Sequence, residues 1–382
     1  MKLLFDLRAA QSNISGKRHG GGKFAEVVFS RIVERELPVC CFYNSNFWLN
    51  PGIEQLMNKH QIECYDLKDK NLQQVIDEHE IKRVYSALPV NVFHIDNCDV
   101  IGTIHGLREF ETPLDNYFFK YKGQQMRYII KFFLQKYIPS IGNIIDYRRD
   151  RGYINKKNFR FFTVSNHSLW SFKTYFPECK DRDIKVFYSP STSSKTPVTT
   201  KKFEDKYFLL VSANRWEKNN LRAVEALDHL FSNGYLEEFK VRITGATSGK
   251  IFKYKIKNPD KFEFMGYVDD DVLEQLYHDA YCFIYPSLNE GFGYPPLEAM
   301  RYGIPVIASP YSSIPEVCQG AVLYANPQSV EEIMARILQI SYDFSLYKDY
   351  SQRSLKEYNL ITKKQKEDLD KMIDFLYEGL TD

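Results

Sequence analysis

The chain has 382 residues, enough for two or three domains of ordinary size, so a small scaffold held together by disulfides is excluded. Its 44% hydrophobic, 15% aromatic and 26% charged residues are typical of a globular protein and exclude intrinsic disorder. The 51 Lys and Arg residues nearly balance the 49 Asp and Glu residues, which gives a formal net charge of +2. A protein with so small a net charge does not bind a nucleic acid or a membrane over its whole surface. Any such partner must bind to a local charged patch.

The seven cysteines are scattered, and none forms a C-x-x-C pair. Neither a disulfide framework nor a zinc knuckle is therefore predicted. The apolar run at the N-terminus is cut short by Asp6 and Arg8, unlike the core of a signal peptide. No stretch approaches the roughly 20 apolar residues that span a bilayer. We therefore expect a cytoplasmic protein.

The first half of the chain alternates short β-rich runs with helix-like stretches. Strands are predicted over residues 3–7, 39–43, 83–87, 99–104, 161–165 and 185–188, and helices over 23–36 and 71–79. This alternation is typical of a parallel sheet with crossover helices. Residues 189–202 are rich in Ser, Thr and Pro, as in an exposed connection, and we place the domain boundary there.

The second half repeats the alternation more clearly. Strands are predicted over residues 207–212, 240–244, 262–265, 281–285 and 305–308, and helices over 219–231, 269–280 and 295–302. From about residue 345 the pattern is helical and rich in charges. These elements predict a second doubly wound α/β domain followed by C-terminal helices.

One segment departs from the overall charge balance. Residues 117–160 contain 11 Lys and Arg residues but only two acidic residues, Asp146 and Asp150, so the local charge is +9. Apolar residues recur within it at helical spacing: Met126, Ile129, Ile130, Phe133 and Tyr137. Such a stretch can lie on an anionic membrane surface, where each nearby cation contributes about 1 kcal/mol. A helix that packs on its own domain with a solvated basic face is the alternative, and the sequence leaves both open.

Three short motifs resemble known sites but lack the required context. Residues 20–25 match G-x-G-x-x-A, yet about a dozen residues separate them from the first strand, and no acidic residue ends the second strand. Residues 245–250 lack the leading glycine of a phosphate loop. The run Asp269-Asp270-Asp271 precedes a helical pattern, so helix capping accounts for it.

The most informative segment, residues 285–300, follows a predicted buried strand and opens a helix. Pro295 and Pro296 favour a helix start, because the first N–H groups of a helix have no intrahelical partner. Gly291 and Gly293 allow a ligand to approach the backbone closely. Ligands bind at the carboxyl ends of strands in open α/β sheets, so this segment predicts an anion site.

Two carboxylates, Glu290 and Glu298, flank the predicted anion site. Carboxylates beside an anion are repulsive unless they accept hydrogen bonds from neutral hydroxyl groups. We therefore expect one of them to bind a sugar and the other a ribose, at the two ends of a diphosphate. Helix electrostatics for Glu298 and a solvated loop acid for Glu290 are the alternatives.

The pattern Pro-Ser-x-x-Glu-Gly-Phe-Gly-x-Pro-x-Leu-Glu-Ala-Met over residues 286–300 resembles the signature of retaining glycosyltransferase family 4. Gly-x-Pro-Val-Ile-Ala over 303–308 and Ser-x-Pro-Glu-Val over 313–317 extend the resemblance, which runs from about residue 207 to 325. It implies the GT-B fold, in which two Rossmann-like domains face each other across a cleft. Residues 1–200, including the basic segment 117–160, would form the acceptor-side domain. Residues 201–345 would bind the nucleotide sugar, and residues 346–382 would cross back to the first domain.

The resemblance also implies roles for individual residues. Arg215 and Lys218, in the strand-to-helix loop over 212–219, would clamp the donor diphosphate and stabilise its charge as it leaves. Glu290 would hold sugar hydroxyls, Glu298 the ribose, and His105 would orient the transferred sugar. The other expected donor contacts are Gly20, Gly21, Gly22, Gly245, Val268, Gly291, Phe292 and Gly293. Arg108, Glu109 and Glu111 are further cleft candidates, which the sequence does not rank.

The sequence thus predicts a retaining glycosyltransferase that moves a hexose-like unit from a nucleotide-diphosphate sugar to a glycan or lipid-linked acceptor in polysaccharide or glycoconjugate assembly. No metal or other cofactor is expected, because cations and a helix terminus supply the positive charge. The balanced net charge gives no reason to expect a nucleic-acid partner. The basic segment adds peripheral contact with the inner face of an anionic membrane as one interpretation. A sugar-nucleotide epimerase of the same architecture and a catalytically silent nucleotide-sugar-binding protein remain as alternatives.

Overall fold

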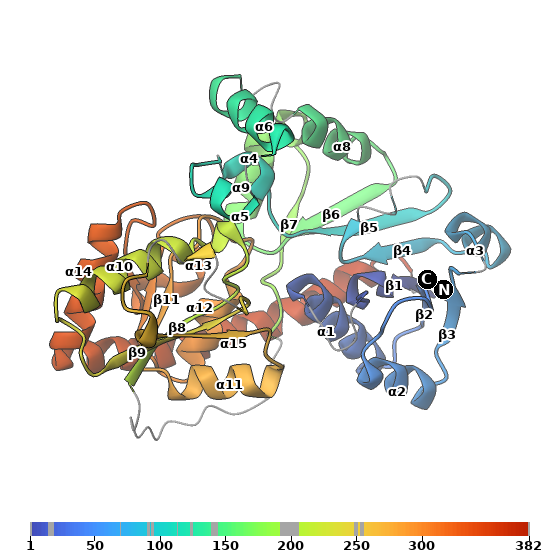
Figure 1. The fold of residues 1–382 in the computed structure, drawn as a ribbon. Helices are drawn as coiled ribbons and strands as arrows, with labels where there is room; N and C mark the ends of the chain where they lie inside the picture. Colours follow the sequence, from blue (N-terminus) through green and yellow to red (C-terminus); the bar gives the residue numbers. More distant parts are fainter. Residues whose placement is uncertain are drawn as a thin grey trace. The chain divides into compact units, whose positions relative to one another are not determined.

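The computed structural model describes residues 2–13, 19–68, 70–89, 92, 95–112, 114–122, 125–138, 144–191, 206–247, 251–252 and 256–380. The chain forms two compact units, and neither is continuous in sequence (Figure 1). The first comprises Met1–Gly106, Asp146–Ser194 and Thr362–Asp382, and the second comprises Leu107–Ile145 and Lys195–Ile361. Most of the predicted boundary over 189–202 lies outside the described residues.

The first unit contains a seven-stranded sheet in the order β3-β2-β1-β4-β5-β6-β7, with all neighbours parallel. Its strands are β1 (Leu3–Asp6), β2 (Val39–Tyr43), β3 (Glu63–Asp66), β4 (Arg83–Ser86), β5 (Asp99–Ile104), β6 (Phe159–Thr163) and β7 (Lys185–Val186). Its helices are α1 (Gly20–Glu34), α2 (Pro51–Lys59), α3 (Leu72–Glu78), α8 (Ile144–Ile154, from Asp146 on) and α9 (Asn166–Tyr175). Parallel neighbours need such crossover helices.

The start of α1 corrects one expectation. The sequence predicts a helix from Lys23, but the helix begins three residues earlier, at Gly20. The Nδ1 atom of His19 accepts a hydrogen bond from the N–H of Gly22 at 3.1 Å and so caps the first turn. The three glycines therefore form helical backbone.

The second unit contains a six-stranded parallel sheet in the order β10-β9-β8-β11-β12-β13. Its strands are β8 (Lys206–Leu210), β9 (Phe239–Thr244), β10 (Phe262–Gly266), β11 (Cys282–Tyr285), β12 (Val306–Ala308) and β13 (Leu323–Tyr324). The helices that follow these strands are α10 (Asn220–Ser232), α11 (Asp270–Asp279), α12 (Tyr294–Arg301), α13 (Ile314–Cys318) and α14 (Val330–Tyr342).

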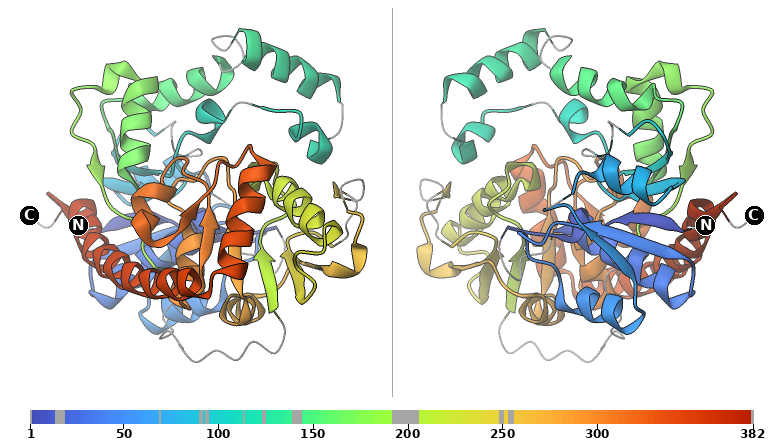
Figure 2. Two further views of the ribbon diagram at one scale, coloured as in Figure 1. Left: turned by 90° about the vertical axis from the view of Figure 1, so that its left-hand side faces the viewer. Right: turned by 90° about the vertical axis from the view of Figure 1, so that its right-hand side faces the viewer.

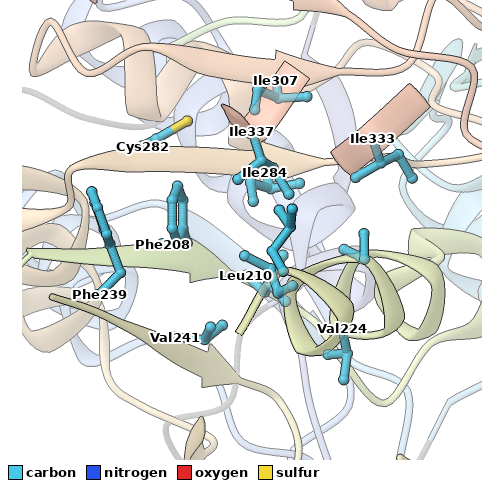
Figure 3. Close-up of a cluster of buried hydrophobic side chains, with 14 of the residues drawn as sticks. Phe208, Leu210, Val224, Phe239, Val241, Cys282, Ile284, Ile307, Ile333 and Ile337 are labelled. Atoms are coloured by element: carbon cyan, nitrogen blue, oxygen red, sulfur yellow. The ribbon is translucent and has the colours of Figure 1, made fainter. Parts of the chain in front are cut away.

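Helices cover both faces of this second sheet (Figures 1 and 2). Beneath α10 and α14 lies a hydrophobic cluster that includes Phe208, Leu210, Val224, Ile284 and Ile337, all of them fully buried (Figure 3). Burying a side chain of this size contributes about 1.5–3 kcal/mol. Helices α11 and α12 pack on the opposite face. This core fixes β8 and β11, and the loops that follow these two strands carry most of the candidate site residues.

A segment that precedes β6 in sequence belongs to the second unit. It contains α4 (Arg108–Glu111), α5 (Phe118–Lys122) and α6 (Met126–Tyr137). Arg222 Nη2 donates to Asp115 Oδ2 at 2.7 Å, and the hydroxyl group of Tyr117 donates to Glu225 at 2.9 Å. The ring of Phe118 meets that of Trp216 edge-on, with 5.4 Å between the centroids. These contacts attach residues 107–122 to α10 and to the loop before it.

The long C-terminal helix α15 (Phe344–Tyr377) belongs to the second unit as far as Ile361 and to the first unit from Thr362 on. In the first unit, Gln365 Nε2 donates to the carbonyl oxygen of Ser189 at 2.5 Å. Asp368 accepts from the N–H of Tyr188 at 3.0 Å. Among the helices in the described part of the chain, none combines the length and hydropathy needed to cross a bilayer.

Candidate active site

The site lies where the order of strands in the second sheet reverses. Strands β8 and β11 are hydrogen-bonded neighbours, although β9 and β10 come between them in sequence. In doubly wound sheets, ligands bind beyond the carboxyl ends of the strands at such a switch point. The loop after β8 carries Arg215, Glu217 and Lys218, and the loop after β11 carries Glu290. The fold therefore brings two of the predicted motifs to one edge of the sheet.

A buried ion pair joins the two loops. Lys218 Nζ donates to Glu290 Oε1 at 2.5 Å and to the hydroxyl oxygen of Tyr285 at 2.6 Å. The same Glu290 oxygen accepts from Tyr285 at 2.7 Å and from Ser287 Oγ at 2.6 Å. The side chains of Lys218 and Glu290 are only 6% and 9% exposed. A pair so far removed from water is stable only when further hydrogen bonds offset its desolvation, and the two hydroxyl groups supply them.

The electrostatics of the site keep Glu290 ionised. Burial alone would raise the pKa of Glu290, but the positive charges of Lys218 and Arg108 and the hydrogen bonds from Lys218 and Ser287 lower it to about 2. Burial also lowers the pKa of Lys218, and the charge of Glu290 opposes that shift. At neutral pH Glu290 is therefore a carboxylate with a cation against one of its oxygens.

A second carboxylate, Glu217, holds two arginines. Its Oε1 atom accepts from Arg215 Nε at 2.7 Å and Nη2 at 2.6 Å, and from Arg108 Nη1 at 3.3 Å. Burial would raise the pKa of Glu217, but the charge of Arg215 lowers it below its ordinary value. The Glu217 side chain is 11% exposed, whereas the side chains of Arg215 and Arg108 are 43% and 38% exposed. Both arginine side chains are thus partly exposed.

The loop after β11 is held in place through its backbone. The N–H of Leu288 donates to the carbonyl oxygen of Glu217 at 2.8 Å. The N–H of Glu290 donates to Ser312 Oγ at 2.8 Å, and the Glu290 carbonyl oxygen accepts from Ser313 Oγ at 2.9 Å. Hydrogen bonds at both the N–H and the carbonyl oxygen of Glu290 therefore fix the backbone that carries its carboxylate.

The glycine turn leads directly into α12. Gly293 has φ 102°, in the left-handed region that favours glycine, and caps the helix that begins at Tyr294. A Cβ atom on Gly293 would contact only Ile314, at 3.7 Å, so backbone conformation rather than crowding requires glycine here. Phe292 is buried, whereas Gly291 is partly exposed.

Glu298, the second predicted carboxylate, lies one turn into α12 and is half-buried. It accepts a hydrogen bond from the hydroxyl group of Tyr277 on α11. Burial and this carboxylate together raise the pKa of Tyr277. The predicted ribose-binding residue thus has a protein hydroxyl group as one of its partners.

Gly245 and Val268 lie at the ends of the neighbouring strands β9 and β10. Gly245 has φ 87°, and a Cβ atom there would lie 2.9 Å from the backbone of both Ser212 and Ala213. Close packing of the loops after β8 and β9 therefore requires this glycine. Its N–H donates to the carbonyl oxygen of Gly266 at 2.6 Å, and the partly exposed Val268 follows two residues later.

The remaining predicted residues belong to the first unit. Gly20, Gly21 and Gly22 form the first turn of α1. A Cβ atom on Gly22 would lie 3.0 Å from the carbonyl oxygen of Ala9, whereas one on Gly20 would have open space around it. Only part of this glycine run therefore serves packing within the unit.

His105 follows β5, as predicted, and its ring packs edge-on against Phe24 with 4.9 Å between the centroids. Its Nε2 atom lies 3.0 Å from the carbonyl oxygen of Ala87. Because a carbonyl oxygen only accepts, Nε2 carries the proton and Nδ1 is the unprotonated acceptor. Burial lowers the pKa of His105 to about 4, so the ring is neutral at neutral pH.

Three residues of the site were not predicted from the sequence. Glu217 holds the arginines, and Tyr285 and Ser287 hold Glu290. All three lie within five positions of a predicted residue, but nothing in the motif indicates which partner each one takes. In the described ranges, no three His, Cys, Asp or Glu side chains come together as they would around a metal ion.

Residues 193–357 match the family model described as Glycosyl transferases group 1. The chain is 50% identical over 82 residues to O-antigen chain mannosyltransferase B of Escherichia coli, which is 22% of each chain. It is 32% identical over 185 residues to O-antigen chain mannosyltransferase RfbU of Salmonella typhimurium, covering 47% of this chain and 51% of the relative. The chain thus spans about half the length of one of these relatives and about a fifth of the other.

Solved structures share the fold over almost the whole chain. Sucrose-phosphate synthase from Thermosynechococcus elongatus has a TM-score of 0.68 at 13% identity, with 100% of this chain and 99% of that chain covered. Anabaena HepE in complex with UDP-glucose has a TM-score of 0.63 at 14% identity, with 98% and 100% covered. At such identities the likeness concerns the fold alone. Together with the two parallel sheets, it confirms the predicted GT-B class of two Rossmann-like domains.

The stretch that matches the family model includes the loops of Lys218 and Glu290 and the helix of Glu298, where the resemblance was first noted. The predicted recognition is confirmed to this extent: residues 193–357, less than half of the chain, match the glycosyl transferases group 1 model.

Proposed function

We propose that the protein is a retaining glycosyltransferase that moves a hexose from a nucleoside diphosphate sugar to a glycan or lipid-linked acceptor in polysaccharide assembly. The observation that carries the proposal is the buried pair of Lys218 and Glu290 at the switch point of the second sheet. A cation and a carboxylate held there can serve the diphosphate and the sugar of one donor molecule.

Lys218 suits a leaving diphosphate. An ammonium group has three N–H donors, and Glu290 and Tyr285 take two of them. The third can bond a phosphate oxygen, where a charge-assisted hydrogen bond contributes about 1.5–3 kcal/mol. Negative charge on the diphosphate grows as the bond to the sugar breaks, so this contact strengthens in the transition state. Arg215, partly exposed beside Lys218, adds a second cation.

Glu290 suits the sugar. Within the part of the chain that the structure describes, its side-chain hydrogen bonds go to Oε1, from Lys218, Tyr285 and Ser287. The other oxygen, Oε2, is left to accept from sugar hydroxyl groups. In this proposal Glu298 holds the ribose, and the neutral Nδ1 of His105 accepts from a hydroxyl group of the transferred sugar.

We take mannose as the first candidate for the transferred hexose, because the relatives from Escherichia coli and Salmonella typhimurium are named as mannosyltransferases. The test supplies mannose and glucose on uridine, guanosine and thymidine diphosphates, with a polysaccharide acceptor, and measures nucleotide release. NMR of the product then gives the anomeric configuration. Release of nucleotide with the donor's configuration retained supports the proposal. A donor sugar altered without any acceptor would instead indicate an epimerase.

The proposal includes no metal cofactor, because Lys218 and Arg215 can supply the positive charge that the diphosphate needs. Its test is activity before and after treatment with a chelator. Turnover should be unchanged by the chelator. A loss of activity that is reversed by adding Mg²⁺ or Mn²⁺ would contradict the proposal that no metal is needed.

Peripheral contact of α6 with an anionic membrane is a further part of the proposal. Met126, Ile130, Phe133 and Tyr137 lie at positions i, i+4, i+7 and i+11, and between 52% and 70% of each residue is exposed. These positions form one face of the helix. Basic residues flank that face, and α6 contains no acidic residue. The other face of α6 packs on its own domain, as the alternative interpretation expects: the ring of Phe132 contacts that of Phe119, with 5.3 Å between the centroids.

Sedimentation with phosphatidylcholine vesicles, with and without phosphatidylglycerol, tests this contact. We expect binding that requires the anionic lipid and is lost in Phe133→Glu. The matched control is Phe344→Glu, which changes a residue that is 63% exposed on α15. Binding that ignores the anionic lipid, or that survives Phe133→Glu, would contradict a membrane role for α6.

A further inference from the structure

We propose that Arg108 is a third cation of the donor site and that it binds the phosphate nearest the transferred sugar. The inference rests on the proposed function and adds a residue from outside the stretch that matches the family model. Arg108 opens α4, in the segment that packs on the second unit.

The hydrogen bonds of Arg108 leave most of its donors unused. A guanidinium group has five N–H donors, and within the described residues Arg108 makes one long bond, from Nη1 to Glu217 Oε1 at 3.3 Å. Its Nε atom is buried and has no partner within the described part of the chain. Buried donors in proteins are almost always paired, so an unpaired one at the edge of a candidate site calls for a ligand.

Glu217 does not satisfy Arg108, because it already serves Arg215. The same oxygen accepts two shorter bonds from Arg215, at 2.7 and 2.6 Å. An arginine with a partly exposed fork suits a phosphate group, which can accept two parallel bonds from it.

The charges at the site also leave room for an anion. Among the residues joined by these ion pairs, three cations, Arg108, Arg215 and Lys218, meet two carboxylates, Glu217 and Glu290, so one positive charge is in excess. A diphosphate carries at least two negative charges, which this positive excess attracts. Arg108 shares a short helix with Glu111, which accepts from Asn289 beside Glu290, so its segment lies next to the carboxylate assigned to the sugar.

The segment that carries Arg108 is anchored on both sides of the site. Asn289 precedes Glu290 in sequence, and its Nδ2 atom donates to Glu111 Oε2 at 2.7 Å. Asp115 accepts from Arg222 at 2.7 Å. These bonds hold in place the segment from which the Arg108 side chain extends.

The experiment compares nucleoside diphosphate with nucleoside monophosphate binding by calorimetry, using the full chain and the base that binds best. We expect Arg108→Ala to weaken diphosphate binding about tenfold or more, the lower bound for one lost charge-assisted bond. Monophosphate affinity should change less than twofold, because that ligand lacks the second phosphate. The diphosphate affinity of Arg108→Lys should lie between those of the wild type and Arg108→Ala, since lysine keeps the charge but lacks the two parallel donors of a guanidinium group.

Two control variants separate contact from structure. Arg127→Ala removes an exposed arginine of α6 that donates to Gln125 and Tyr128, and it should leave nucleotide affinity unchanged. Asp115→Asn weakens the anchor to Arg222 but keeps Arg108, and it should retain most of the diphosphate affinity.

Unchanged diphosphate affinity in Arg108→Ala would overturn the proposal, and so would an equal loss for both nucleotides. A loss in Asp115→Asn as large as that in Arg108→Ala would also overturn it, because the segment and not the guanidinium group would then matter. A wild-type protein that binds no nucleoside diphosphate would contradict the proposed function itself, which distinguishes that failure from this one.

Discussion

Lys218 and Glu290 are 72 positions apart in sequence, yet the ammonium nitrogen of one lies 2.5 Å from the carboxylate oxygen of the other. The pairing of β8 with β11 produces this contact, because it places the loops after the two strands side by side. The ion pair therefore depends on the order of strands in the sheet, and its disruption should affect both stability and turnover.

The first prediction concerns Lys218→Met, which keeps the side-chain length but removes the charge. It leaves the buried carboxylate of Glu290 without its cation, and breaking a buried pair in this way costs about 3–5 kcal/mol. We expect a lower free energy of unfolding by chemical denaturation and a lower turnover number at saturating donor.

The double variant Lys218→Met with Glu290→Gln is the control. It removes both charges, so most of the lost stability should return while activity stays low. Wild-type turnover in Lys218→Met at saturating donor would remove this residue from the mechanism.

The second prediction concerns pH. The pKa of Glu290 is about 2 in the folded chain, below the ordinary value of 4.5 for a glutamate. A carboxyl group with a lowered folded pKa contributes stability above its unfolded value and loses it as the pH falls. The difference in unfolding free energy between wild type and Glu290→Gln should therefore shrink as the pH falls from about 4.5 to about 2. A difference that stays constant over this range would show that Glu290 is not held as a carboxylate.

The third prediction concerns the ribose site. Glu298→Ala should weaken nucleotide binding by about 1–3 kcal/mol, the range for a lost hydrogen bond to a charged group. Tyr277→Phe is the matched control, because it removes the hydroxyl partner of Glu298 but keeps the carboxylate. Calorimetry should show a clearly smaller loss for Tyr277→Phe. Equal losses would mean that Glu298 acts only by packing against α11.

The fourth prediction concerns the protonation of His105. Because burial lowers the pKa of His105 to about 4, its imidazole signals should not titrate between pH 5.5 and 8 in NMR spectra. The signals are assigned by their loss in His105→Gln. That variant should also lower turnover, since the proposed acceptor Nδ1 is gone. A titration midpoint near 6.5 would contradict the buried, neutral ring.

The sequence contained enough information to predict both sheets and the main loops of the site. The glycine turn before α12 and the cations after β8 occur in short motifs, and the order of elements predicts a doubly wound fold. Strands β3 (Glu63–Asp66) and β13 (Leu323–Tyr324) were not predicted, because both are edge strands, of only four and two residues. Edge strands show the weakest hydrophobic signal of a parallel sheet.

The partners of the site residues could not be predicted in the same way. Arg215 and Arg108 both donate to the same oxygen of Glu217. Arg108 and Glu217 are more than a hundred positions apart, so no local pattern predicts that the two arginines share this oxygen. The attachment of residues 107–122 to α10 could not be predicted either, because no local sequence pattern indicates that Asp115 pairs with Arg222. Periodicity reports the face that a helix buries but not the element that covers it.

The most direct test of the account is a calorimetric titration of the wild-type chain with uridine, guanosine and thymidine diphosphates, each compared with its nucleoside. The account predicts that at least one diphosphate binds, and that it binds about tenfold or more tightly than its nucleoside, because Lys218 and Arg215 meet the phosphates. Absence of binding by all three diphosphates, or equal affinity for nucleoside and diphosphate, would contradict a donor site between the loops of β8 and β11.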